Sequence, residues 1–341
     1  EDKKQYVAAA ESFERLNNKY PDSKFADKAL FNASIDYINA DQGEKAMSST
    51  NRFLRKYPDS TMVPKMMLAL ASYFDDKLDY AHAANYYELL SEKDPKGQYA
   101  ADALFNAGVY RENLKSYSKA LANYDLHLKR YPHSKDSADI FFSIGMIYEK
   151  ERDWKNAAAT FKAYPQRYGQ KKAKVIEAYY RQGQAMDKLK ETTAATRAYQ
   201  TAVYLNRKYG EDPAIGKNVG GQYAAKSALE LTKPMLEDFR AIRLRMPQAA
   251  LTRAITQKAE LLKRLRDRYL DIINVGNPEV GVAALYYVGL IYQEFSQALF
   301  NAPVPKKLTP EEVQLYQQEL TNRATPIEEK AVEAYEKAVA K

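Results

Sequence analysis

The chain has 341 residues, and its 52 Lys and Arg exceed its 44 Asp and Glu by 8. It contains no Cys, which excludes disulfides and thiolate metal sites, and no apolar run approaches the ~20 residues of a membrane-spanning helix. The modest positive excess is compatible with acidic partners and does not require nucleic acid. The 28 Tyr are predicted to be mostly large core side chains whose hydroxyl groups stay hydrated.

An alanine recurs at a constant step of 37 residues through the first part of the chain, at Ala9, Ala46, Ala83, Ala120, Ala157 and Ala194. A proline keeps the same step at Pro21, Pro58, Pro95 and Pro132. A fixed period of this length on helix-favouring sequence is typical of stacked helix pairs, each of which buries its apolar face only against its neighbours. The sequence therefore predicts an all-α solenoid.

The period predicts a lone helix over 4–19 and then helix pairs near 23–56, 60–93, 97–130, 134–167 and 171–208. One position of the first helices is always small, and an aromatic side chain follows the alanine of the second helices by one turn; these residues are Ser34, Ala71, Gly108 and Gly145, and Tyr87, Tyr124 and Phe161. This small-then-aromatic spacing resembles the tetratricopeptide repeat. Because the lone helix lacks its partner, we expect further residues before Glu1 in the intact protein, with a signal peptide or lipid anchor as the open question.

Three connectors share a Tyr-Pro-Asp-Ser or Tyr-Pro-His-Ser sequence, at residues 20–23, 57–60 and 131–134. Proline ends the preceding helix, and the Ser or Asp is expected to cap the amides of the next one. Pro64 is expected in the first turn of its helix, where proline is tolerated. We interpret these connectors as structural.

The period ends after Tyr209, and an irregular loop is predicted around Gly216, Gly220 and Gly221. Two longer helices are predicted from about 219 to 275, broken near Met246-Pro247. The second carries an apolar stripe at Leu251, Ile255, Leu262, Leu265, Tyr269 and Ile272. The face opposite this stripe is predicted to be basic. Its cations, over the stretch 240–268, are Arg240, Arg243, Arg245, Arg253, Lys258, Lys263, Arg264, Arg266 and Arg268. A solvated face explains them, and an acidic protein, an anionic membrane surface or, last, a nucleic acid is the alternative, with Arg264, Arg266 and Arg268 as the binding residues.

A split repeat is predicted at the end of the chain. Gly289-Leu290-Ile291-Tyr292 parallels Gly145-Met146-Ile147-Tyr148 and predicts a first helix over about 279–300, and Ala331, Tyr335 and Ala338 restore the second-helix pattern. Residues 301–325 form an insertion that either caps the solenoid or docks a partner, through Leu308, Val313, Leu315, Tyr316 and Leu320. The domain prediction is therefore a repeat array over 1–209, irregular helices over 210–278 and the split pair over 279–341.

No constellation of catalytic or metal-binding residues is found. His127 and His133 are six residues apart, which does not place them on one helix face, and neither they nor His82 have Cys or clustered carboxylates to complete a metal site. We expect solvated or half-packed histidines. No strained turn carries a Ser or Cys nucleophile near a His. The chain is accordingly predicted not to be an enzyme and to bind no metal, cofactor or small-molecule substrate.

Two further resemblances concern bacterial envelope proteins. The repeats with Tyr-Pro-Asp-Ser connectors resemble those of BamD-type outer-membrane assembly lipoproteins and of the periplasmic cell-division coordinator family, over roughly residues 1–209. The segment Asn301-Ala-Pro-Val-Pro-Lys-Lys-Leu-Thr-Pro-Glu-Glu, with Pro326-Ile-Glu-Glu-Lys-Ala-Val-Glu-Ala-Tyr-Glu, resembles tetratricopeptide proteins associated with gliding motility in deltaproteobacteria. These resemblances imply a periplasmic or outer-membrane-associated location and partners within an envelope complex.

Partner binding is predicted on the inner face of the first helices, at Asn32, Ile35, Ser72, Asn106, Val109, Met146 and Lys150. Chaperone-binding tetratricopeptide domains clamp a terminal carboxylate with a Lys at positions that correspond here to Phe31, Leu68, Phe105 and Phe142, so this face should suit an extended or helical segment with apolar anchors. The predicted function is a non-enzymatic scaffold of a cell-envelope assembly, related through the second resemblance to gliding motility. The alternative is a cytosolic regulatory or nucleic-acid-binding adaptor that uses the basic helix of 240–268.

Overall fold

A computed structural model describes residues 2–211 and 220–340, and these residues form fifteen α-helices and no β-strand. The prediction of an all-α fold built from helix pairs is confirmed. The chain divides into two compact units, Glu1–Glu151 and Arg152–Lys341. Gly216 of the predicted irregular loop lies outside the described residues, and Gly220, in the left-handed conformation (φ 71°), directly precedes the helix that follows the loop.

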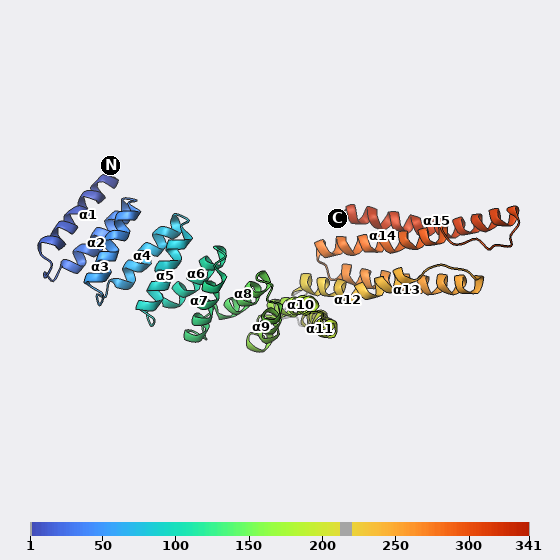
Figure 1. The fold of residues 1–341 in the computed structure, drawn as a ribbon, viewed down its shortest axis with the longest axis horizontal. Coiled ribbons are helices and arrows are strands. Elements are labelled where there is room, and N and C mark those ends of the chain that lie inside the picture. Colours follow the sequence, from blue (N-terminus) through green and yellow to red (C-terminus); the bar gives the residue numbers. More distant parts are fainter. Residues whose placement is uncertain (1, 212–219, 341) are drawn as a thin grey trace. The chain divides into compact units, whose positions relative to one another are not determined.

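The first unit is a row of antiparallel helices in which each helix packs on the next, drawn from blue to green in Figure 1. Its helices are α1 (Asp2–Lys19), α2 (Ala26–Asn39), α3 (Gly43–Lys56), α4 (Val63–Asp76), α5 (Tyr80–Lys93), α6 (Ala100–Asn113), α7 (Tyr117–Arg130) and α8 (Ser137–Lys150). From α2 to α8 every helix has 14 residues. The predicted lone helix and the predicted pairs over 23–56, 60–93 and 97–130 are found at their predicted places.

The second unit begins with short helices of the same kind and ends in four long ones, which run alongside one another in Figure 1. Its helices are α9 (Trp154–Arg167), α10 (Lys172–Lys188), α11 (Thr192–Gly210), α12 (Gly221–Ala241), α13 (Gln248–Asn274), α14 (Pro278–Phe300) and α15 (Pro310–Val339). The break at Met246-Pro247 separates α12 from α13, as predicted. Leu262, Leu265, Tyr269 and Ile272 of the predicted stripe on α13 join the core of this unit.

The turn inside each helix pair repeats its backbone conformation as well as its sequence position. Asp41, Leu78, Lys115 and Arg152 stand 37 residues apart, and all have φ between 57° and 63°, in the left-handed region. The next such residue is Lys190, one residue later than the step predicts. The repeat therefore lengthens by one residue between the fourth and fifth pairs.

The alanine series is also displaced by one residue at each of its two ends. Ala46, Ala83, Ala120 and Ala157 are fully buried as predicted, whereas Ala9 and Ala194 are only half-buried. Their neighbours Ala10 (0% exposed) and Ala195 (1%) take the buried place. The prediction was wrong by one residue at both ends, because packing selects the residue that faces the partner helix rather than the one that keeps the step.

The connectors also differ in detail from the prediction. Ser23, Ser60 and Ser134 do not cap the following helix, because each accepts a hydrogen bond from the amide two residues on and so closes a turn that precedes it. The residues next to the helix starts, Phe25 and Met62, make no side-chain cap. The connector tyrosines instead join successive connectors: the Tyr131 hydroxyl donates to the Pro95 carbonyl at 2.7 Å. Pro64 lies in the first turn of α4, as predicted.

Close packing of a glycine against a tyrosine ring holds several helix pairs together. A Cβ at Gly108 would lie 2.3 Å from the Tyr124 ring, and one at Gly183 would lie 2.4 Å from the Tyr199 ring. The Tyr124 hydroxyl donates to Glu112, and the Tyr199 hydroxyl donates to Asp187, each across 12 residues of sequence. Any side chain larger than hydrogen at these glycines would push the second helix away from the first.

The same arrangement recurs between α14 and α15. A Cβ at Gly289 would lie 2.6 Å from the Tyr335 ring, and the Tyr335 hydroxyl donates to Gln293 across 42 residues instead of 12. The two halves of the split repeat therefore pack as a helix pair despite the residues between them.

His127 on α7 is fully buried, which contradicts the expected solvated or half-packed side chain. It occupies the repeat position of Phe53, Leu90 and Tyr164, which are all buried. Neither ring nitrogen has a hydrogen-bond partner among the described residues, and the ring packs edge-on against Tyr131. Burial lowers the pKa of His127, and the nearby carboxylates of Asp136 and Asp102 offset this only in part.

We predict that His127 makes the protein less stable in mild acid. Because its pKa is lower in the folded chain than in the unfolded chain, the unfolded state takes up the proton first, and stability falls as the pH drops below about 6.5, by at most about 1.4 kcal/mol per pH unit. Urea unfolding at several pH values should show this slope, and His127→Leu, which copies Leu90, should reduce it. An unchanged slope in the variant would show that other groups cause it.

Candidate protein-binding surfaces

The predicted inner-face residues lie on the first helices of successive pairs in the first unit, α2, α4, α6 and α8. All seven are accessible: Asn32, Ser72 and Lys150 are exposed, and Ile35, Asn106, Val109 and Met146 are half-buried. Helices α2 and α4 also contact each other directly. The assignment of this face to partner binding stays a prediction.

Two of these residues meet at one tyrosine. Ser72 of α4 and Asn106 of α6 both act on the Tyr87 hydroxyl of α5: burial raises the pKa of Tyr87, and these two polar side chains oppose the rise. Ser72 also lines a hollow beside Asp41 and Lys77, where hydrogen bonds from Lys77, Lys3 and Tyr73 lower the pKa of Asp41 to about 2. Ser72 therefore lies beside a charged, hydrogen-bonded group on this face.

Lys150 is held in place by an acidic residue of the neighbouring pair. Its ammonium group lies 2.8 Å from Glu112 of α6, the carboxylate that also accepts the Tyr124 hydroxyl. Val109 packs beside the cluster of Ala120, Tyr124 and Ile140. Between them, Val109 offers apolar surface and Lys150 a positioned charge.

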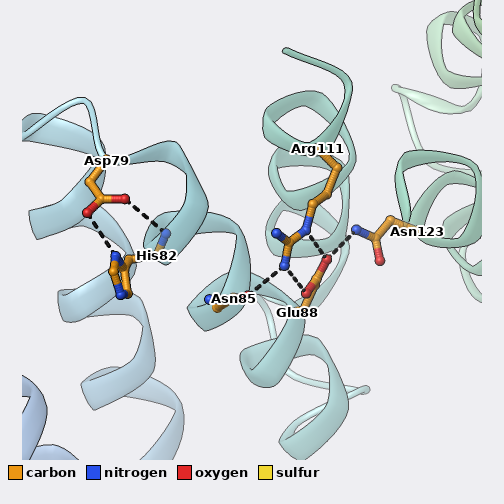
Figure 2. Close-up of polar contacts among 6 residues, drawn as sticks. All are labelled: Asp79, His82, Asn85, Glu88, Arg111 and Asn123. Atoms are coloured by element: carbon orange, nitrogen blue, oxygen red, sulfur yellow. Dashed lines mark hydrogen bonds and ion pairs between the residues drawn. The ribbon is translucent and has the colours of Figure 1, made fainter. Parts of the chain in front are cut away.

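A buried polar network that sequence reasoning missed lies between α5, α6 and α7 (Figure 2). Arg111 is 5% exposed and binds Glu88 through two hydrogen bonds of 2.8 and 2.7 Å. It also donates to Asn85 at 2.6 Å, and Asn123 donates to Glu88 at 2.8 Å. Although burial alone would raise it, the pKa of Glu88 lies below its usual range because Arg111 and Asn123 donate to the carboxylate. Figure 2 also shows Asp79, which caps α5 through the His82 amide.

The network replaces an aromatic contact of the preceding repeat. Arg111 stands one step after Phe74, and Asn123 stands one step after Tyr86. The Phe74 and Tyr86 rings are stacked with centroids 5.8 Å apart. The sequence did contain a signal for this network: Arg111 interrupts a series of aromatic residues at one repeat position, whose other members are Tyr37, Phe74 and Tyr148.

We predict that Arg111→Met lowers the free energy of unfolding by about 2–3 kcal/mol, because Glu88 then keeps its charge without its partner; since the Glu88 side chain is 30% exposed, water limits the loss. The double variant with Glu88→Gln should recover part of the loss. Urea unfolding followed by circular dichroism measures both. A single variant as stable as the parent would show that the pair contributes nothing.

Only some of the cations predicted on the basic face of α13 are exposed and unpaired. Arg264 and Arg268 are exposed, and Arg268 lines a hollow between α11, α12 and α13. Arg266 pairs with Asp267 at 2.6 Å. Lys258 was wrongly placed on this face: it lies three residues after Ile255 and four before Leu262, hence on the apolar stripe, and it is 4% exposed.

The insertion residues divide between the core and the surface. Leu320 is buried in a cluster with Leu251 of α13 and Ala302, and Tyr316 packs on the same cluster while donating to the Pro303 carbonyl at 3.3 Å. Leu308 and Val313 are half-buried, and Leu315 is 70% exposed. Residues 310–325 belong to the continuous helix α15, in which Pro326 is internal. The capping part and the accessible part of the insertion are therefore different side chains of one helix.

We predict opposite effects for two leucines of this helix. Leu320→Ala should cost about 2 kcal/mol through lost packing, whereas Leu315→Ala should change stability by no more than about 0.5 kcal/mol. Thermal unfolding compares the two variants. Equal melting temperatures would contradict the assignment of Leu320 to the cap.

A family model described as a tetratricopeptide repeat matches residues 28–60 and 139–170. The chain therefore contains tetratricopeptide repeats. The first match covers α2, α3 and the following connector, and the second covers nearly all of α8, then α9 and its connector. No curated protein matches the sequence.

Several solved structures are similar to this tetratricopeptide-repeat chain at low identity. The C-terminal part of a repeat protein from Cytophaga hutchinsonii is 13% identical, with 89% of this chain and 98% of that chain covered and a TM-score of 0.40. A tetratricopeptide repeat protein from Parabacteroides merdae is 12% identical, with 87% and 99% covered and a TM-score of 0.36. BtubC from P. vanneervenii is 14% identical, with 61% and 90% covered and a TM-score of 0.36.

Neither a metal site nor a membrane span is found in the part of the chain that the structure describes. No group of three or more His, Cys, Asp or Glu side chains is placed to hold a metal ion there. No helix in 2–211 or 220–340 is both long and apolar enough to cross a membrane.

Proposed function

We propose that this tetratricopeptide-repeat chain is a non-enzymatic scaffold of a bacterial cell-envelope assembly, periplasmic or associated with the outer membrane, and that the assembly serves gliding motility. The tetratricopeptide fold supports a protein–protein interaction scaffold, because stacked helix pairs present extended surface. The envelope and motility assignments rest on the resemblances of the Tyr-Pro-Asp-Ser connectors and of the C-terminal segment.

The observation that carries the scaffold proposal is the row of accessible side chains on the first helices. Ile35, Val109 and Met146 stand at one repeat position and supply half-buried apolar surface on α2, α6 and α8. Ser72 occupies the same repeat position on α4, and Asn106 lies three residues before Val109 on α6; both are polar groups that can hydrogen-bond the backbone of a bound segment. Apolar anchors at a regular spacing with polar groups between them suit an extended or helical segment of another protein.

The cytosolic or nucleic-acid-binding alternative has less to support it. It depends on the cations of 240–268, and several of these already have partners: Arg240 binds Glu294, Arg266 binds Asp267 and Lys258 is buried. Nucleic-acid binding needs cations that are free to neutralise phosphates and so displace the counterions condensed on the nucleic acid. The exposed charge left on this stretch is smaller than its composition indicates.

We predict that Met146→Glu and Val109→Glu reduce capture of the envelope partner at least tenfold, since each places a charge among the apolar anchors. The measurement is cross-linked affinity capture from envelope and cytosolic fractions of the source bacterium, quantified by mass spectrometry. Leu78→Glu is the matched control, because Leu78 is 70% exposed in a turn away from the anchors. Circular dichroism verifies that each variant is folded.

Capture that is equal in all variants would move the binding face elsewhere. Partners found only in the cytosolic fraction would support the alternative function.

A further inference from the structure

A basic pocket lies in the second unit where α12 ends. It is lined by Arg240, Arg243, Arg245, Lys258, Glu294 and Gln297, among others, and so draws on α12, the segment after it, α13 and α14. The pocket is separate from Arg264, Arg266 and Arg268, which the sequence singled out.

Two arginines of the segment after α12 line this pocket. Ile242 has extended backbone angles (φ −68°, ψ 112°), and residues 242–245 have no helical structure. Alternate side chains of an extended segment face opposite sides. All four residues 242–245 line the pocket, but their exposure alternates: Leu244 is half-buried and packs on the apolar clusters of the unit, whereas Arg243 and Arg245 are exposed.

The pocket also has a buried cation. The Lys258 ammonium donates to the Phe239 carbonyl at 2.6 Å and lies 3.9 Å from the centre of the Phe239 ring. It thereby satisfies carbonyl groups at the end of α12, where a helix carries partial negative charge. Burial lowers the pKa of Lys258, the positive charges of Arg243 and Arg240 act in the same direction, and Glu294 opposes them.

The carboxylate that lines the pocket is already engaged. Glu294 accepts three hydrogen bonds of 2.6–3.1 Å from Arg240, so that this pair is neutral as a unit. Arg243, Arg245 and Lys258 leave an uncompensated positive charge around the hollow, and the two arginines are accessible. Guanidinium groups bind carboxylates through paired hydrogen bonds.

We infer that this pocket binds an acidic segment of a partner protein, in extended conformation and with carboxylates at alternating positions. Two extended segments that lie side by side have the same rise per residue, so carboxylates at positions i and i+2 face Arg243 and Arg245. This inference rests on the proposed scaffold function, to which it adds a second binding site and a class of partner.

The test uses a fluorescent peptide of alternating Glu and Ser and a peptide of the same composition in which all Glu are contiguous, with the full-length chain at physiological salt. Fluorescence anisotropy should show tighter binding of the alternating peptide. Arg243→Glu with Arg245→Glu should weaken it at least tenfold. The matched control is Arg253→Glu with Lys263→Glu, which makes the same charge change at exposed residues of α13 outside the pocket and should weaken binding less than twofold.

Equal losses in the two double variants would overturn the inference, since they would indicate diffuse attraction by net charge. Absence of peptide binding by the parent chain, or equal affinity for both peptides, would also overturn it. The inference would also be overturned if the pocket bound duplex DNA, or vesicles containing anionic lipid, more tightly than the alternating peptide. If the charge reversal impairs folding, the Gln variants at Arg243 and Arg245 replace it. Because Val109→Glu and Met146→Glu lie in the other unit, they should leave peptide binding intact, which separates failure of this site from failure of the proposed function.

Discussion

The fold depends on the close approach of the two helices in a pair, and in several pairs this approach depends on a glycine that faces a tyrosine ring. At Gly108 and Tyr124, and again at Gly183 and Tyr199, there is no room for a Cβ. The tyrosine hydroxyl then reaches a carboxylate one turn further along the first helix, so that one side chain supplies both apolar packing and a hydrogen bond. The same contact between Gly289 and Tyr335 shows that helices separated by a long insertion still meet as a pair.

Buried polar and titratable side chains occur at positions where one repeat differs in sequence from its neighbours. Arg111 replaces a ring and brings Glu88 and Asn123 into a buried network, and His127 replaces Phe or Leu in a buried place. In both cases the surrounding helices keep their arrangement, because the pairs on either side supply the packing. A buried ion pair with all its hydrogen bonds satisfied can fix the register of neighbouring helices, whereas a buried imidazole without partners makes the site sensitive to protonation.

The second unit uses longer helices and treats its charges differently. Lys258 lies on an apolar stripe and is tolerated because carbonyl groups at the end of α12 accept its hydrogen bonds. Leu320 closes the cluster at Leu251, while Leu315 on the same helix remains accessible. The surface available to partners therefore consists of the cations and apolar side chains that the packing of the unit leaves exposed.

The sequence by itself determined the repeat and nearly all helices, because period, proline position and small-residue spacing are local properties of the chain. It located α14 and the second-helix pattern of α15 from Gly289 and Tyr335, and it identified the break at Met246-Pro247. Only the tertiary structure decided which of two adjacent alanines is buried, since Ala195 rather than Ala194 faces its neighbour when the repeat lengthens by one residue. It also decided which cations are accessible. Arg240 is paired with Glu294, Arg266 with Asp267, and Lys258 is bound at the end of α12. Of these partners, only Asp267 is close in sequence to the cation that it binds. Composition counts such cations, but only their three-dimensional neighbours show which of them can still bind a partner.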